Sequence, residues 1–104
     1  MVKEITNYKE LKEKADSDWN IHRIAAAQSD IATEGILRKL SNDISWVVRL
    51  NVIKNSNLSD DLLVERFKEE KDAVVLKQIM DKLEERNLGH YLKVRFSGGK
   101  AWDH

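Results

Sequence analysis

The sequence predicts an all-α fold, and three observations support this prediction. Proline is absent from the 104 residues and only four glycines occur, although β-strands need frequent sharp turns that these two residues usually supply. Lys, Glu, Leu and Ala, which favour helices, are abundant. Similar phrases also recur 27 residues apart, and a repeat of this length is typical of stacked helical units.

We expect six helices separated by short polar turns. Asn7 with Glu10 resembles a capping box, so the first helix runs from there to about Ala15. Polar or acidic residues precede each later helix, at about 19–28, 33–40, 44–54, 59–70 and 73–86. Thr33 is a suitable cap for the third helix. Gly89 is expected to take the left-handed conformation that ends the last one.

The repetition indicates how these helices pack. The stretch "SWVVRLNVIKNSNLSDDLL" repeats the pattern of "DWNIHRIAAAQSDIATEGI", with Trp46 in the place of Trp19 and Asn55 in the place of Gln28. Each repeat holds one longer and one shorter helix and cannot bury its apolar face alone. We therefore predict a short right-handed α-α superhelix of about 2.5 repeats with a 27-residue period. It forms one domain at 1–89, followed by an irregular C-terminal arm at 90–104.

The stretch "DISWVVRLNVIKNSNLSDDLLVERFKEE" resembles the variant leucine-rich repeat and, more loosely, the HEAT-like repeats of armadillo-type proteins. The resemblance covers about residues 16–80. It departs from the family phrase where Ser56 replaces a proline. His22 and Leu76 stand where the other copies would repeat Arg49. The family phrase is filled here by Asp43, Val48-Arg49, Val52-Ile53, Asn55-Ser56 and Leu62-Leu63. The resemblance implies a right-handed superhelix and no catalytic residue.

Composition excludes several classes of function. Eighteen basic residues balance eighteen acidic ones, so no global field draws the chain to nucleic acid or anionic lipid. No apolar run approaches the roughly 20 residues of a membrane span, and the first residues lack the apolar core of a secretion signal. Cysteine is absent, which removes disulfides and thiolate chemistry. We expect a cytoplasmic protein without membrane attachment.

No pattern indicates an enzyme. Phosphate-binding glycine loops and zinc or calcium motifs are missing from the sequence. Asp18 and His22 stand four residues apart and on a helix share a face suited to a metal, but we favour a cap for Asp18 and an ordinary surface role for His22. The pairs Asp60-Asp61 and Glu69-Glu70 sit at helix ends or on a polar face, where acid–base catalysis is not expected. We therefore predict no catalytic residue, no metal and no cofactor.

The tryptophans and several cations are the candidate partner-binding residues. Trp19 and Trp46, one repeat apart, either form an exposed aromatic ladder or fill the seam between repeats, and core or edge packing with partial burial is favoured. Arg49 is expected to form a structural bridge, with Asp43 or with an acid of the next unit. Partner contacts are assigned to Trp19, Trp46, Arg38, Lys39, Arg49, Lys54 and Trp102.

The tail "HYLKVRFSGGKAWDH" departs from the repeat. Leu92, Val94 and Phe96 alternate with polar residues, which fits a short strand or an extended arm docked on the array, with disorder from Ser97 onward. The alternative is a basic arm that binds a partner or nucleic acid. Trp102 is then an exposed anchor or a dimer contact.

These features favour a non-enzymatic scaffold or adaptor for protein–protein interaction. Two alternatives stay open: a nucleic-acid-binding HEAT-like module, against which the charge balance argues, and a small accessory or inhibitory subunit of a larger complex. The sequence does not distinguish a monomer from a weak dimer.

Overall fold

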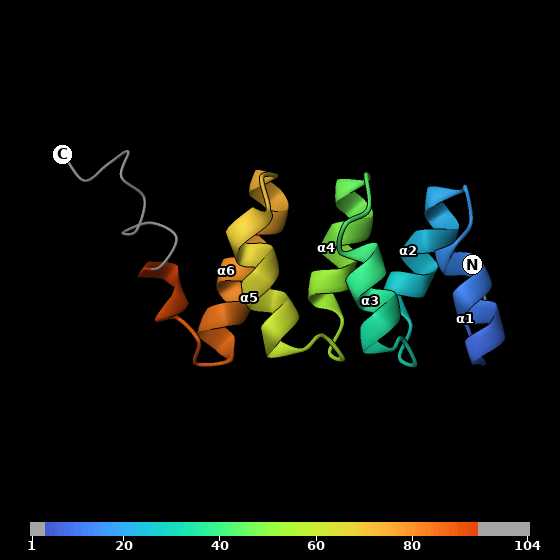
Figure 1. Ribbon diagram of the computed structural model, residues 1–104, viewed down its shortest axis with the longest axis horizontal. Helices are drawn as coiled ribbons and strands as arrows, with labels where there is room; N and C mark the ends of the chain where they lie inside the picture. The colour runs from blue at the N-terminus through green and yellow to red at the C-terminus, as the bar shows by residue number, and fades with distance from the viewer. Residues whose placement is uncertain (1–3, 94–104) are drawn as a thin grey trace. The chain divides into compact units, whose positions relative to one another are not determined.

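The computed structural model describes residues 4–93, and these residues are helical without a strand (Figure 1). The predicted all-α fold is therefore confirmed. Six helices of seven or more residues follow one another along the described chain: α1 (Tyr8–Ala15), α2 (Asn20–Gln28), α3 (Glu34–Leu40), α4 (Trp46–Lys54), α5 (Asp60–Glu69) and α6 (Ala73–Glu85).

Side-chain caps explain where most of these helices begin. An oxygen of the residue before the helix accepts a hydrogen bond from a backbone N–H of the first turn, which would otherwise lack a partner. The Asn7 amide oxygen accepts from the Glu10 N–H at 2.8 Å, which is one half of the predicted capping box, and the Glu10 carboxylate accepts from the Thr6 N–H at 3.4 Å. The caps of α3, α4 and α6 are Thr33, Ser45 and Asp72. Trp19 precedes α2 and supplies no such bond.

The end of α6 differs from the prediction. Asn87, with φ of 61°, takes the left-handed conformation, and no described glycine has a positive φ. The N–H of Leu88 then donates to the carbonyl of Leu83 at 2.7 Å, the bond that closes a helix ending of this kind. Asparagine tolerates this conformation better than other residues with a side chain, so Asn87 ends the helix two residues before Gly89.

The chain divides after Ser59 into two compact units, Met1–Ser59 and Asp60–His104. In the first unit α2 packs against α1, α3 and α4. Leu11, Ala26 and Leu37 are fully buried there, and each buried leucine contributes roughly 1.5–3 kcal/mol. In the second unit α5 packs against α6, with Phe67 and Leu83 buried.

Equivalent helices begin 26 residues apart through most of the described chain, instead of the predicted 27. The first residues of α1, α3 and α5 are 8, 34 and 60, and those of α2 and α4 are 20 and 46. Only α6, at 73, begins 27 residues after its predecessor α4. Aligning the two tryptophans produced the longer period, because Trp19 precedes α2 whereas Trp46 is the first residue of α4.

Two asparagines connect successive loops of the first unit. The Asn55 amide nitrogen donates to the carbonyls of Ala27 and Ser29, at 2.8 and 2.9 Å. Two residues later, the Asn57 side-chain nitrogen donates to the backbone carbonyls of Asp30 and Ala32, at 2.8 and 3.0 Å. These bonds fix the end of α4 beside the end of α2, so the two helices run side by side in the same direction (Figure 1). A superhelix that continues through all repeats stays a prediction.

The C-terminal arm lies mostly outside the described residues. Residues 91–93 form a helical turn, in which the Tyr91 N–H donates to the carbonyl of Leu88. The predicted strand is therefore wrong for these residues. Val94, Phe96, the predicted disorder from Ser97 onward and the anchor role of Trp102 fall on residues that are not described.

Candidate functional site

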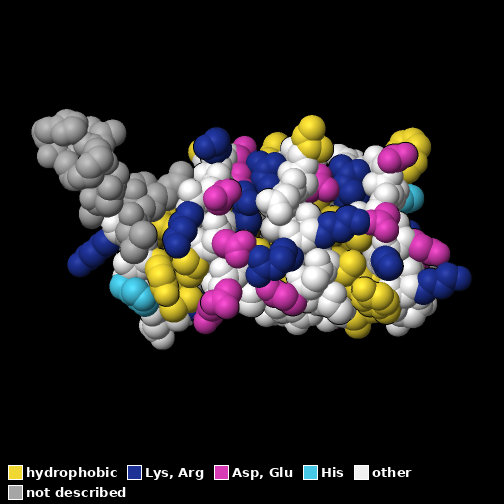
Figure 2. All heavy atoms as spheres, in the orientation of Figure 1, with side chains coloured by type: hydrophobic (Ala, Val, Ile, Leu, Met, Phe, Trp, Pro, Cys, Tyr) yellow, Lys and Arg dark blue, Asp and Glu magenta, His cyan; other side chains and the backbone are white. Residues whose placement is uncertain are grey.

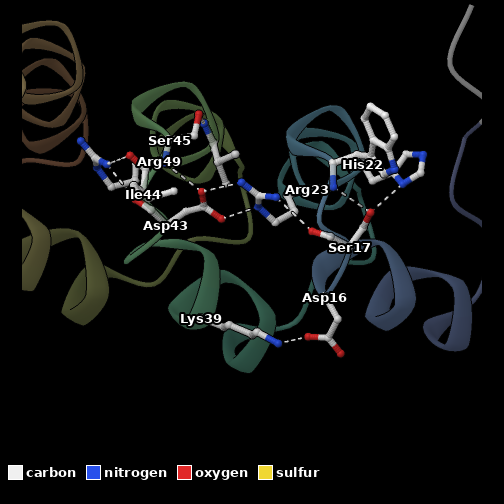
Figure 3. A network of polar contacts seen from close by, with 11 residues as sticks. Asp16, Ser17, His22, Arg23, Lys39, Asp43, Ile44, Ser45 and Arg49 are labelled. Carbon is white, nitrogen blue, oxygen red and sulfur yellow. Dashed lines mark hydrogen bonds and ion pairs between the residues drawn. The ribbon is translucent and has the colours of Figure 1, made fainter.

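An ion pair joins α2 to the loop that precedes α4. Arg23, on α2, donates from Nε and Nη2 to the two carboxylate oxygens of Asp43, at 2.7 and 3.2 Å (Figure 3). Its Nη1 donates to the carbonyl of Ser17 at 3.0 Å. The Asp43 carboxylate also accepts from the Ser45 N–H at 2.9 Å, which orders the entry into α4. Such a two-point pair fixes orientation as well as distance.

The ionisation of both partners reflects this geometry. Burial by itself raises the pKa of the Asp43 carboxyl. The hydrogen bonds from Arg23 and the Ser45 N–H, together with the charges of Arg23 and Arg49, outweigh burial and hold the pKa below its usual 3.8. The hydrogen bond to Asp43 raises the pKa of Arg23 in turn. Asp43 is therefore a structural carboxylate, and its lowered pKa does not suit it to accept a proton at neutral pH.

Arg49 occupies the same local position on α4 as Arg23 on α2. Its Nη1 donates to the carbonyls of Asp43 and Ile44, at 2.7 and 3.2 Å. Arg23 and Arg49 each bond the carbonyl six residues earlier. The counterpart of Arg49 is therefore Arg23, and the assignment of His22 to that place is wrong. An ion pair between successive repeats is present, and Asp43 forms it with Arg23. The bridge predicted for Arg49 is seen as its bond to the Asp43 carbonyl, and a bridge from Arg49 to an acid of the next repeat stays a prediction.

His22 lies beside the first of these loops and has a hydrogen-bond partner. Its Nδ1 is 2.8 Å from the Ser17 hydroxyl, which also accepts the Trp19 N–H at 3.1 Å (Figure 3). Within residues 4–93, no group of three ligating side chains is placed to hold a metal ion.

Four large apolar side chains are exposed where α2 and α4 begin. The exposed fractions are 69% for Trp19, 53% for Ile21, 93% for Ile44 and 43% for Trp46. Hydrophobic side chains of the first unit stand out at this end in Figure 2. The favoured prediction, core or edge packing with partial burial, is therefore wrong for Trp19, whereas Trp46 has more than half of its surface buried. Trp19 lies in the loop just before α2, and Trp46 is the first residue of α4. Both rings therefore stand at helix N-termini.

The outward sides of α2 and α4 extend this apolar region along both helices. Side chains four, three or seven residues apart share one side of a helix. On each helix the residues at such spacings are exposed or half-buried, while Ala26 and Val52 on the opposite side are fully buried. We call this surface the α2–α4 face. It consists of Asn20, Ile21, Ile24, Gln28, Trp46, Val47, Leu50 and Lys54, with Trp19 and Ile44 at its N-terminal edge.

The α2–α4 face has a regular order. At the 26-residue spacing, Ile21 corresponds to Val47 and Ile24 to Leu50, so aliphatic residues occupy the same positions on both helices. Gln28 and Lys54 form the opposite edge from the tryptophans. The Gln28 amide nitrogen donates to the Asn51 side chain at 3.1 Å, which links the two helices.

The predicted cations do not all belong to this face. Arg38 and Lys39 lie on α3, where Arg38 pairs with Glu34 at 3.0 Å and Lys39 pairs with Asp16. Figure 2 shows Lys, Arg, Asp and Glu side chains interspersed over the side that it displays. Lys54 is exposed on the α2–α4 face, and Arg49 lies at its N-terminal end. The structure thus brings together Trp19, Trp46, Arg49 and Lys54 of the predicted residues.

Sequence reasoning missed the aliphatic part of the surface. The predicted partner-binding residues do not include Ile21, Ile24, Ile44 or Leu50. One signal was available: α4 is apolar on nearly every side, yet neighbouring helices do not cover all sides of it. A surplus of apolar residues over the area that can be buried predicts an exposed apolar side.

Within residues 4–93, no helix combines the length and the apolar character needed to cross a membrane. Comparison with protein family models, with curated proteins and with solved structures gives no match for this chain.

Proposed function

We propose that this chain is a non-enzymatic interaction module that binds another protein through the α2–α4 face. The choice of residue before α2 carries the proposal. Four other described helices begin with Asn7, Thr33, Ser45 or Asp72, each of which caps its helix. Trp19 holds the equivalent place at α2, forms no cap and leaves most of its ring exposed. A position that gives up local stability for an exposed aromatic is expected at a binding site.

The surroundings of Trp19 support the same function. Trp46, Ile21 and Ile44 extend one exposed apolar surface, and aromatic anchors with aliphatic neighbours are characteristic of the centres of protein interfaces. The Arg23–Asp43 pair and the Asn55 bonds hold α2 and α4 in register, so the surface is preformed. We infer further that the helix pairs belong to a superhelix of the variant leucine-rich repeat type, and that the chain acts as a cytoplasmic adaptor.

A peptide selection tests this function. The immobilised full chain is panned against a displayed library of random 16-residue peptides, and the affinities of the enriched peptides are measured for wild type and variants. Trp19→Ser and Trp46→Ala are each expected to weaken binding at least about tenfold, since buried aromatic anchors dominate interface energies. Tyr8→Ala removes an aromatic of similar exposure from α1 and is the matched control, expected to leave binding within about twofold.

The choice of Trp19→Ser removes an ambiguity. Serine supplies the cap that Trp19 lacks, so a loss of binding is not explained by unfolding. Enriched peptides that bind all variants equally, or a library that yields no binder above background, would overturn the proposed function.

A further inference from the structure

Two charged side chains stand at opposite corners of the α2–α4 face and carry opposite signs. Asp18, exposed beside Trp19, lies in the loop before α2, and Lys54, also exposed, is the last residue of α4. Among residues 4–93, neither side chain takes part in an ion pair. Because α2 and α4 run side by side in the same direction, these two charges mark the ends of one diagonal across the face (Figure 1).

The other cations near the face already have partners. Arg23 is paired with Asp43, and Arg49 donates to two carbonyls of the loop before α4. The face therefore does not favour an occupant with charges of one sign, because any anion attracted by Lys54 at one corner is repelled by Asp18 at the other. An occupant that fits both corners carries one charge of each sign, placed in the reverse order.

A second copy of the chain meets this requirement by symmetry. A two-fold dimer uses the same surface on both subunits, so a contact between residue i and residue j is formed twice. A two-fold axis that lies in the interface, across the diagonal, places Asp18 of each copy opposite Lys54 of the other. The helices of the two copies then run in roughly opposite directions, and both charged corners are matched at once.

The composition of the face also fits a homodimer. Seven of its ten residues are apolar, and interfaces between identical subunits are more apolar than those of transient complexes. The chain has no net charge, so long-range repulsion does not oppose self-association. The face has fewer residues than the roughly 20–30 of a standard interface, so we expect a weak dimer, with a dissociation constant on the order of 10–100 µM.

We propose that the α2–α4 face binds a second copy of this chain, with the apolar side chains of both copies packed together and Asp18 of each copy paired with Lys54 of the other. This inference goes beyond the proposed function, because the occupant is the chain itself. The two occupants compete for one face, so a partner protein binds by displacing the second copy.

Sedimentation velocity of the full chain at low salt, from about 5 to about 500 µM, tests the inference. The average mass of the wild type is expected to rise from that of one chain towards that of two. Trp19→Ser and Trp46→Ala should each weaken the association at least about tenfold, because each removes a ring from both halves of the interface. Tyr8→Ala removes an exposed aromatic from α1 and should change it less than about twofold.

Charge reversal locates the contact. Asp18→Lys and Lys54→Glu each place like charges opposite one another at two points of the dimer, so each is expected to weaken association about tenfold. An equal mixture of the two variants should associate within about twofold of the wild type, because every contact of the mixed dimer again joins opposite charges. Lys9→Glu, on an exposed lysine of α1, is the control and should alter association less than about twofold. Circular dichroism and thermal unfolding confirm that the variants fold.

Three results would overturn the inference: a wild-type mass that stays that of one chain at every concentration, charge variants that associate as the wild type does, or a mixture that associates no better than either variant alone. Selected peptides that bind a monomeric chain and depend on Trp19 and Trp46 would assign the face to another protein, which overturns the inference and leaves the proposed function standing. A dimer with the expected charge dependence, in a chain that enriches no peptide, would overturn the proposed function alone.

Discussion

At the scale of single residues, Asp43 connects two helix pairs of the first unit. Asp43→Asn keeps the shape and the acceptor for the Ser45 N–H but removes the charge that faces Arg23. We expect the free energy of unfolding at pH 7 to fall by about 1–3 kcal/mol, because the pair is largely buried and a charged partner is left behind. Urea denaturation followed by circular dichroism measures this change.

The effect of Asp43→Asn should depend on pH in one direction. The folded-state pKa of Asp43 lies below the usual 3.8, so the ionised form favours folding. Its contribution is complete above about pH 5 and is lost as the pH falls through the folded-state pKa. The difference between wild type and variant should therefore shrink below about pH 4. Asp81→Asn, in the exposed pair with Lys77, should change stability little at any pH, and an equal loss there would contradict this assignment.

Asn55 is a second residue whose role is long-range. Asn55→Ala removes the donor to the Ala27 carbonyl and one of the two donors to the Ser29 carbonyl, which keeps the Ala32 N–H, and we expect a loss of about 2–3 kcal/mol in unfolding free energy because Asn55 is buried. Asn57→Ala also removes two bonds, but nearer to solvent, where water replaces the donor, so about 1 kcal/mol is expected. Equal losses in chemical denaturation of the two variants would argue against a buried role for Asn55.

At the scale of helices, α2 begins at a residue that does not cap it. Its preceding position has an extended backbone suited to a capping side chain, with φ of −86° and ψ of 123°. Trp19→Ser and Trp19→Ala both lose the contacts of the ring, but only serine gains a cap. We expect the serine variant to be about 1 kcal/mol more stable than the alanine variant. Thermal and urea unfolding of the pair measure this difference, and identical stability would show that the α2 terminus needs no cap.

The positions of helices were largely predictable because their signals are local. Asn7 and Thr33 cap the helices that the sequence assigned to them, and a cap acts on N–H groups two or three residues away. The errors are local too. The helix expected from Ile44 begins at Trp46, because Ser45 caps it and leaves Ile44 in the loop. Asn87 takes the place assigned to Gly89, since both residues tolerate the left-handed conformation and only the backbone decides between them.

At the scale of the whole chain, the equality of 18 basic and 18 acidic residues predicts weak attraction to nucleic acid. We expect no shift of a double-stranded DNA fragment in a gel-shift titration at about 0.1 M salt, because the acidic side chains offset the cations and leave no net positive charge to attract the duplex. Binding that weakens steeply with added salt would contradict this expectation and revive the nucleic-acid alternative.

The sequence by itself determined the helical class, the approximate helix ends and the recurrence of equivalent helices, because helix propensity, caps and periodic apolar residues act within a few positions of the chain. Only the tertiary structure decided that Asp43 pairs with Arg23, twenty residues earlier, and that Asn55 bonds the loop after α2. It also decided that Trp19 and Trp46 face outward. Exposure depends on which sides of a helix its neighbours cover, and the apolar pattern of α4, nearly uniform around its axis, does not say which side stays open.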